Sequence, residues 1–416
     1  MPEIATVAAP TATVGAPTTV PSEAESPLSV WAVPAFAPAN VEPDGARGFV
    51  AAIEAAAAND ARLECDVTLV PERGPEGVLA LLASTTSAAP NARPDVVMLP
   101  LDVLGAAIAQ GLIQPVPDTV PSGRVDDAYG FARDAAYQGG VDHAWAVPFA
   151  VDVAHAIARD EPVPATWEQA IDEGVLFVLP SGEYPGAAAL IGSAYLSGDY
   201  SGAAQGDGDE GTPGNDGTSG VAAVDAARLS SSITPLANAI AAQVVAAPDA
   251  EASTSVRAAW NTFLLREAER AVVSAGVFAP HQAGFPALTW GPIPTGEGKG
   301  PSRPIGWGWG LAVTTPDPAR AAIAGDLIAH LTEPGDAGWV LGADYLPALA
   351  TGWPEQVANG IDPAPSTEYI DFVEDLLASA VGVGELPGRW EAWGGVAESL
   401  LSGSSAADAA ATMSAE

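Results

Sequence analysis

Short apolar runs alternate with longer Ala-rich runs along most of this chain. The apolar runs LSVWAV, CDVTLV and DVVML have the length of buried strands and occupy residues 28–33, 65–70 and 95–99. Helical spacing follows each strand, at residues 46–59, at 75–85, and from Leu101 to Gly111, where the glycine is a plausible helix terminus. Strands and helices that alternate every 10–15 residues predict an α/β fold.

The second half of the chain continues this alternation. Strands are expected at residues 174–180, 271–278, 288–298 and 305–315. Helices are expected at residues 187–198, between 319 and 349, and in the tail from 366 onward. The chain is therefore expected to contain two α/β domains, which its length of 416 residues allows.

Two carboxylates are expected at the ends of apolar strands. Asp102 follows the strand VVML, and the run WAVPFAVD, residues 145–152, is interpreted as a strand that ends at Asp152. Ligands of open α/β sheets lie at the carboxyl ends of strands, so both aspartates are candidate ligand contacts. The alternative is that each caps the helix that follows, because Asp is a favoured N-cap residue.

Tryptophan is frequent, with 11 residues, and four tryptophans are candidate ligand contacts. Trp307 and Trp309 alternate in GWGWG, which places both side chains on one face of a strand. Trp390 and Trp393 lie in GRWEAW, before the last expected helices. Flat aromatic rings bury the apolar faces of sugars, and an indole N–H can donate to a hydroxyl. Core packing is the alternative for all four.

The charge balance excludes several classes of partner. The chain has 15 basic and 52 acidic residues, a net charge of −37, and Lys299 as its single lysine. Binding to nucleic acid needs clustered Lys and Arg, and an anionic membrane surface would repel this protein. A soluble, strongly hydrated surface is the simplest reading of the acidity.

No sequence motif indicates a metal, a cofactor or catalysis. Cys65 is the single cysteine, and the four histidines are scattered without HExxH spacing. There is no GxSxG, no P-loop and no GxGxxG after a strand. A pair of carboxylates across a cleft could still form a glycosidase site, so a glycoside-processing enzyme is kept as a lesser alternative.

Two segments have compositions that cannot form a core. Residues 1–27 are rich in Pro, Thr and Ala and are expected to form a disordered tether. Residues 197–220 form an acidic, Gly-rich insertion, which lacks the closing Glu of an EF-hand calcium loop. No apolar run is long enough for a transmembrane helix, and no signal peptide is visible. The tether suggests that a leader preceded the chain, although a cytoplasmic protein is the alternative.

The order of five segments resembles the family 1 extracellular solute-binding proteins, the maltose-binding-protein type that serves ATP-binding-cassette (ABC) importers. These segments are the strand and helix at residues 94–116, WAVPFAVD, PATWEQAI at 164–171, the Gly-rich strand before a long helix and LPAL, and the terminal helices. The resemblance extends from residue 28 to residue 416. It implies a two-lobed periplasmic-binding-protein fold of type II, with a ligand cleft between lobes that hinge segments join.

The resemblance also implies roles for particular residues. Asp102 and Asp152 match positions where a carboxylate accepts sugar hydroxyls, and Glu183 and Tyr184 in SGEYPG match a ligand loop. Trp390 or Trp393 matches the place of a stacking aromatic. The sequence departs from the family at Leu99, where the maltose binder has an aromatic, and in the run VAHAIARD, which lacks the usual aromatics.

The resulting prediction is an extracytoplasmic substrate-binding component of an ABC importer that closes around a small polar solute, most simply a carbohydrate. A cationic solute, such as a polyamine or quaternary amine, is the alternative ligand. Lobe one is expected at residues 28–117 and 288–336, and lobe two at 118–287 and 337–416. The expected partners are the solute and the permease subunits. The protein is expected to be a monomer at the cell surface, lipid-anchored or periplasmic.

Overall fold

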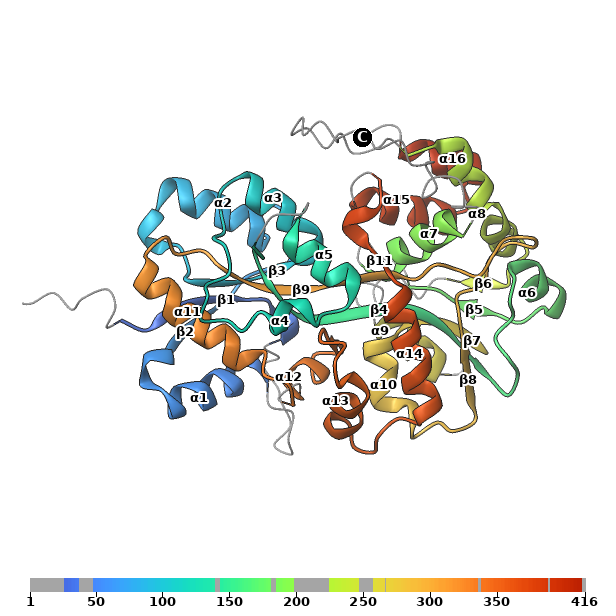
Figure 1. The fold of residues 1–416 in the computed structure, drawn as a ribbon. Coiled ribbons are helices and arrows are strands. Elements are labelled where there is room, and N and C mark those ends of the chain that lie inside the picture. The colour runs from blue at the N-terminus through green and yellow to red at the C-terminus, as the bar shows by residue number, and fades with distance from the viewer. Residues whose placement is uncertain are drawn as a thin grey trace, which may run out of the picture.

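The computed structural model describes residues 26–36, 48–138, 143–180, 185–197, 224–246, 257–265, 267–335, 338–387 and 390–413 (Figure 1). The expected tether, apart from residues 26–27, and the expected insertion, apart from Ser197, lie outside the described residues. Glu183 and Tyr184 also lie outside them. The fold between these gaps is the α/β fold that the sequence predicts.

One sheet of 11 strands runs through both halves of the described molecule (Figure 1). Its main path has the order β2–β1–β3–β9–β4–β7–β5–β6. Those strands are β2 (Cys65–Leu69), β1 (Leu28–Ala32), β3 (Val96–Pro100), β9 (Ile305–Val313), β4 (Val147–Arg159), β7 (Arg270–Ser274), β5 (Phe177–Val178) and β6 (Val245–Ala246). Three more strands pair outside this path: β8 (Leu288–Gly291), β10 (Leu346–Pro347) and β11 (Val381–Gly382).

Strands β4 and β9 connect the two lobes. One end of β9 pairs with β3, from Val313 to Trp309, and its other end pairs with β11 at Ile305 and Gly306. The antiparallel strand β4 pairs with β9 from Val147 to Val153 and with β7 from Ala154 onward. Both strands therefore begin in one lobe and end in the other, which makes them the structural basis of a hinge.

Lobe one carries helices on both faces of its half of the sheet. Helices α2 (Val78–Ala88), α3 (Leu104–Ala109) and α5 (Gly130–Tyr137) lie on the upper face in Figure 1. Helices α1 (Phe49–Asn59), α11 (Pro318–Leu331) and α12 (Gly338–Leu341) lie on the lower face. Strands β3 and β9 between these layers are buried at every residue, as their unbroken apolar runs predict.

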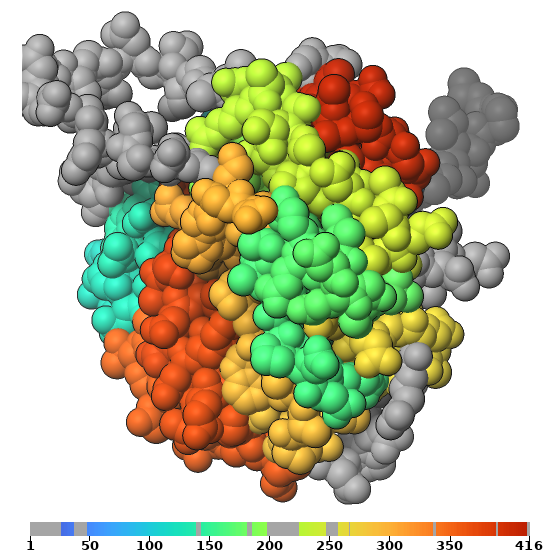
Figure 2. All heavy atoms as spheres, turned by 90° about the vertical axis from the view of Figure 1, so that its right-hand side faces the viewer, coloured from blue at the N-terminus to red at the C-terminus, as the bar shows by residue number. Residues whose placement is uncertain are grey.

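Lobe two has the same layered construction. Its upper helices in Figure 1 are α7 (Gly186–Leu196), α8 (Ala226–Ala241), α15 (Trp390–Leu401) and α16 (Ala406–Thr412). Its lower helices are α9 (Arg257–Leu264), α10 (Ala275–Gln282), α13 (Trp353–Gly360) and α14 (Thr367–Ser379), and α6 (Trp167–Glu173) lies at its end. Figure 2 shows this end. Helix α6 (green) lies next to α8 (yellow-green), and the orange-red α14 lies apart from both, at the left of the view.

The lobe boundaries that we expected from the sequence differ from the strand pairing. Strand β8 pairs with β4 at Ala156–Arg159, in the lobe-two half of the sheet, although residue 288 was expected to begin a lobe-one segment. Helix α5 contacts α3 and the short helix η5 (Leu101–Val103), so this helix, which was expected in lobe two, packs against lobe-one elements. We therefore propose that the boundaries lie within β4 and β9 themselves.

Two expected strand ends are also wrong. Strand β4 continues for seven residues beyond Asp152, because VAHAIAR is apolar enough to be buried in the sheet. The expected strand at residues 271–278 ends at Ser274, whose hydroxyl accepts the Val277 N–H and so starts α10. Asp152 thus lies in the middle of a long strand, beside the beginning of a helix.

No helix among the described residues combines the length and apolar character that crossing a bilayer requires.

Candidate functional site

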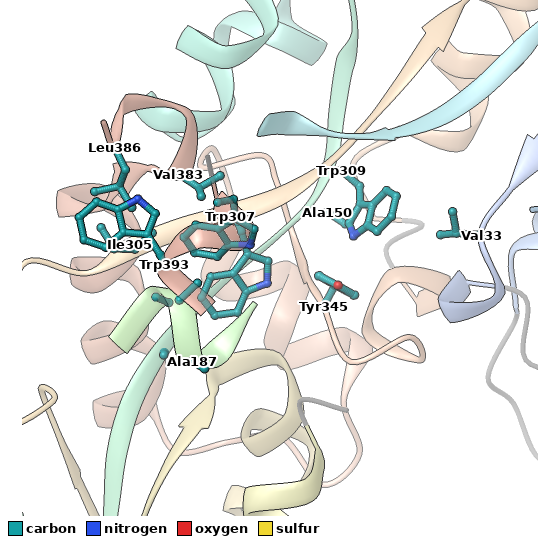
Figure 3. Packing of buried hydrophobic residues seen from close by; sticks show 14 of the residues in the cluster. Val33, Ala150, Ala187, Ile305, Trp307, Trp309, Tyr345, Val383, Leu386 and Trp393 are labelled. Carbon is teal, nitrogen blue, oxygen red and sulfur yellow. The ribbon is translucent and has the colours of Figure 1, made fainter. Parts of the chain in front are cut away.

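The candidate site is built on the face of the β4–β9 pair where the strands pass between the lobes. Asp152 is opposite Trp307, and Ala150 is opposite Trp309. Directly opposite residues of antiparallel strands point to the same face, with Cβ atoms about 4.5–5.5 Å apart. Figure 3 shows Trp307 and Trp309 extending from the same strand, with Tyr345 near Trp309.

Three polar atoms on this face have no hydrogen-bond partner in the structure. They are Oδ2 of Asp152 and the indole Nε1 atoms of Trp307 and Trp309, all buried. Asp152 is 1% exposed, and neither tryptophan is exposed. An unsatisfied buried polar atom costs about 1–3 kcal/mol of stability. Three such atoms on one face therefore indicate a place where a ligand or an ordered water supplies the missing hydrogen bonds.

The second carboxylate oxygen of Asp152 is already in use. Oδ1 accepts the N–H of Val153 at 2.8 Å and the N–H of Gly276 at 2.9 Å. Gly276 belongs to the first turn of α10, so Asp152 satisfies one of the free donors of that helix from a neighbouring strand. One oxygen of the carboxylate therefore stabilises lobe two, while Oδ2 accepts no hydrogen bond in the structure.

Burial sets the protonation of this carboxyl. It raises the pKa of Asp152 to about 7, against the opposing effects of the Gly276 N–H, the Ser274 hydroxyl and the Val153 N–H. The group is thus balanced between its acid and carboxylate forms near neutral pH. In either form it can accept a hydrogen bond, and the acid form can also donate one.

A small cavity adjoins this face. It has a volume of about 10 Å³, which is room for about one water molecule. Trp307, Ala154, Ser274 and Pro180 are among the residues that line it. The cavity therefore lies between Trp307 and Pro180, which directly precedes SGEYPG.

A third segment between the lobes borders the site and was not singled out in the sequence. The ring of Tyr345 lies 5.2 Å from Phe36 of lobe one, and Phe36 lies 5.6 Å from Trp309. Asp344, the preceding residue, forms an ion pair with Arg257 of α9. The expected LPAL turn pointed to this segment, but nothing in the sequence pattern indicated Tyr345 or Phe36.

Asp102 lies in a different environment from Asp152. Both of its carboxylate oxygens accept from Nη2 of Arg73, at 2.8 and 2.9 Å, and its side chain is 9% exposed. Burial raises the pKa of Asp102, and the Arg73 guanidinium opposes that shift. Asp102 lines a pocket together with Gly306, a neighbour of Trp307 whose position faces the other side of the strand.

The two tryptophans near the C-terminus are buried at the start of α15. Trp393 is fully buried, packs 5.3 Å from the ring of Tyr195 and donates its indole N–H to the Pro387 carbonyl at 3.0 Å. Figure 3 labels Trp393 among core residues that include Ile305 and Leu386. Trp390 is 5% exposed. The satisfied N–H makes Trp393 a packing residue in this arrangement, and we do not include it in the site proposed below.

Among the described residues, no group of three or more His, Cys, Asp and Glu side chains is arranged to hold a metal ion.

The comparisons with known proteins agree with this architecture. Residues 42–338 match the family model of the bacterial extracellular solute-binding proteins. Because the match spans most of the chain, this protein belongs to that family. No curated protein matches the chain.

Solved structures share the fold at low sequence identity. The cyclic α-maltosyl-1,6-maltose binding protein of Arthrobacter globiformis is 17% identical, covering 93% of this chain and 97% of its own, with a TM-score of 0.62. Maltose-bound MalE3 of T. maritima is 15% identical, covering 93% and 98%, with a TM-score of 0.67. UgpB of Mycobacterium tuberculosis, in complex with glycerophosphocholine, is 16% identical, covering 94% and 97%, with a TM-score of 0.66. At these identities the likeness establishes the fold, the two-lobed periplasmic-binding-protein fold.

Proposed function

We propose that this protein is the extracytoplasmic substrate-binding component of an ABC importer and that it binds a small neutral polyhydroxylated solute, most simply a carbohydrate. The ligand lies against the face that carries Asp152, Trp307 and Trp309. The permease subunits of the importer are its protein partners.

The observation that carries the proposal is the combination of unpaired groups on that face. Two indole N–H donors and one carboxyl oxygen are buried on adjacent positions of β4 and β9. A hydroxyl group both donates and accepts, so it can satisfy an acceptor and a donor of this kind at once. The indole rings add flat apolar surface of the kind that covers the C–H faces of sugars.

A cationic solute fits these groups less well. An ammonium group can only donate, so it would pair with Asp152 and leave both indole N–H groups unsatisfied. Because burial raises the pKa of Asp152 to about 7, the carboxyl is partly protonated near neutral pH and is a weaker counter-charge for a cation. Glycerophosphocholine, the ligand named for UgpB, shows that this fold also holds a ligand with a quaternary amine. Amines therefore belong in the experimental panel.

The strand arrangement supports binding by hinge closure. β4, β9 and the segment that includes Tyr345 pass between lobes, and residues from both lobes surround the tryptophans. A ligand that contacts both lobes binds the closed arrangement better and so shifts the population toward it. This accounts for recognition of the loaded form by a membrane partner.

The test is calorimetric titration with a panel of mono- and oligosaccharides, polyols, polyamines and quaternary amines. We expect saturable binding of one carbohydrate class, and we expect Asp152→Asn to retain part of that affinity because the amide still accepts from a hydroxyl. Binding restricted to amines, with loss of affinity in Asp152→Asn, would replace the carbohydrate by the cationic alternative. Steady cleavage of an oligosaccharide in the same samples would contradict a binding protein and support the glycosidase alternative.

A further inference from the structure

We propose that Asp344 is a positioning residue for Asp152, because it fixes the first turn of α10, which holds the Asp152 carboxyl, to the chain segment that crosses between the lobes. This crossing segment, residues 342–345, connects α12 of lobe one to β10. Asp344 acts through Asp152 and not on the solute itself. The role rests on the proposed function, in which Asp152 faces the solute.

The crossing segment is attached to lobe one at its beginning and to the strand of the candidate site at its end. The N–H groups of Asp344 and Tyr345 donate to carbonyl groups of α12 at 3.2 and 3.3 Å. Leu346, the next residue, is opposite Val151 of β4 and so lies beside Asp152. Two residues after Asp344, the chain is therefore paired with the strand that carries the candidate carboxyl.

The first turn of α10 lies directly against this segment. A Cβ atom added at Gly276 would lie 2.1 Å from the Asp344 carbonyl oxygen and 2.9 Å from Cα of Tyr345, so only glycine permits the approach. The N–H of the same glycine donates to Oδ1 of Asp152 at 2.9 Å. A displacement of the crossing segment must therefore move the amide that holds Asp152. Helices α12 and α10, which are linked in this way, lie on the same face of the sheet (Figure 1).

The conformation of Asp344 is held by a two-point ion pair. Its φ is 65°, in the left-handed region that Asp and Asn tolerate better than other residues with a side chain. Arg257 of α9 donates from Nε to Oδ2 and from Nη2 to Oδ1 of this carboxylate. Two parallel hydrogen bonds fix the orientation of a carboxylate as well as its position. The Arg257 guanidinium of lobe two thus holds the residue whose carbonyl group lies against Gly276.

The charge of Asp344 also reaches the candidate site. Burial raises the pKa of Asp152, and the negative charge of Asp344 adds to that increase. Burial likewise raises the pKa of Asp344, whereas Arg257 opposes the shift. His281 of α10 and Tyr369 of α14 are the further titratable neighbours of these two carboxyls. Burial lowers the pKa of His281 and raises that of Tyr369, so both are mainly neutral near neutral pH.

The test compares two substitutions that break the same ion pair in the full chain. Asp344→Asn removes the carboxylate and keeps a residue that tolerates a positive φ, whereas Arg257→Gln leaves the carboxylate without its counter-charge. Each is combined with Asp152→Asn, and the difference in melting temperature between single and double variant is followed against pH. The midpoint of that difference reports the titration of Asp152.

We expect the midpoint to lie below that of the parent protein in Asp344→Asn and above it in Arg257→Gln. The two midpoints should differ by about 0.3–1.5 pH units, as expected for partly exposed charge pairs. Arg257→Lys keeps a positive charge and should restore the parent midpoint. A residue that only braced the fold would lower the melting temperature of both variants without separating their midpoints. Midpoints that move together, or that stay with the parent protein, would overturn the role of Asp344.

Hydrogen exchange at the Gly276 amide tests the positional link itself. We expect faster exchange than in the parent protein in both Asp344→Asn and Arg257→Gln, because the turn that holds Asp152 is released. Asp60→Asn is the matched control: it breaks the exposed ion pair of Asp60 with Arg62 in lobe one and should change neither exchange nor midpoint. Unchanged exchange in both test variants would contradict the link.

Neither measurement uses a solute, so the two proposals can fail separately. A panel of solutes that finds no carbohydrate would contradict the proposed function and leave the midpoints as they are. Unseparated midpoints in a protein that binds a carbohydrate would contradict only the role of Asp344.

Discussion

Asp152 on β4 and Trp307 on β9 are opposite each other, and each has one buried polar atom without a hydrogen-bond partner. This residue pair lies where β4 and β9 run side by side between the lobes, on the face of the sheet that also carries Trp309. It places an acceptor and a donor at directly opposite positions on the same face of the sheet.

Replacing Asp152 by Ala should weaken both binding and folding. The loss of a charge-assisted hydrogen bond to the ligand is worth about 1.5–3 kcal/mol, or about a 10- to 150-fold rise in the dissociation constant. The loss of the acceptor for the Gly276 N–H should lower the free energy of unfolding by about 0.5–2 kcal/mol, as loss of a helix cap does. Titration and denaturant melts measure the two effects separately. A stability loss with unchanged affinity would show that Asp152 only caps α10.

Replacing Trp307 or Trp309 by Phe removes an indole N–H while keeping an aromatic ring. We expect each substitution to weaken ligand binding by about 0.5–1.5 kcal/mol, the net value of one hydrogen bond. Trp353→Phe is the matched control, because Trp353 is 1% exposed and its Nε1 is likewise unpaired, but it lies on α13 against Tyr129. Equal affinity losses in all three variants would indicate a general packing effect and would contradict a specific role for β9.

The buried Asp152 should make the protein less stable as the pH rises toward neutral. Its pKa is raised from 3.8 to about 7, so the folded state holds a proton that the unfolded state releases above about pH 4. The stabilisation is complete below pH 4 and is lost as the pH rises through about 7. Melting temperatures of Asp152→Asn should therefore fall less steeply than those of the parent protein between these limits. Parallel profiles would show that the carboxyl does not titrate in this way.

His155 should have the opposite pH dependence. Burial lowers its pKa from 6.5 to about 4, and its Nε2 lies 3.0 Å from the Tyr369 hydroxyl. The stabilisation is present above pH 6.5 and is lost as the pH falls through about 4, because the unfolded state then takes up the proton first. His155→Gln should remove this acid sensitivity in melts between these limits. The exposed His143, changed to Gln, controls for the loss of a histidine.

Two glycines should respond to alanine in opposite ways. A Cβ atom at Gly276 would lie 2.1 Å from the Asp344 carbonyl oxygen, so Gly276→Ala must displace backbone in a segment between the lobes. We expect a loss of about 1–3 kcal/mol, typical of overpacking. Gly395 is in the interior of α15 with no atom near the added carbon, and Gly395→Ala should stabilise the protein by about 0.5–1 kcal/mol. Denaturant melts that show no difference between the variants would contradict the close approach at Gly276.

Local sequence signals correctly predicted much of the fold. The apolar pentapeptides that begin at Leu28 and Val96 form β1 and β3, because such runs are stable only when buried in a sheet. The alternating run that begins at Cys65 forms β2, a partly exposed strand at the end of the main path of the sheet. Gly111 has a φ of 65°, which agrees with the helix end expected there. The alternation in GWGWG placed Trp307 and Trp309 on one face, since a strand fixes that geometry locally.

The hydrogen-bond partners of the two candidate aspartates could not be predicted from the local sequence. Asp102 and Asp152 follow similar apolar runs, yet one is paired with Arg73 from a distant loop and the other holds the start of α10, 124 residues away along the chain. Only long-range packing decides which partner reaches a carboxylate. The same holds for the length of β4, which continues past Asp152 because it pairs there with β7 and β8.

The sequence by itself determined the α/β alternation, the family resemblance and the positions of the candidate side chains, because these depend on near neighbours in the chain. The tertiary structure alone decided that Asp152 Oδ2, Trp307 Nε1 and Trp309 Nε1 are buried and unpaired, and that β3 and β11 leave a gap along β9. Burial and hydrogen-bond satisfaction depend on contacts between segments that are far apart in the chain, and no local pattern encodes which of those contacts form.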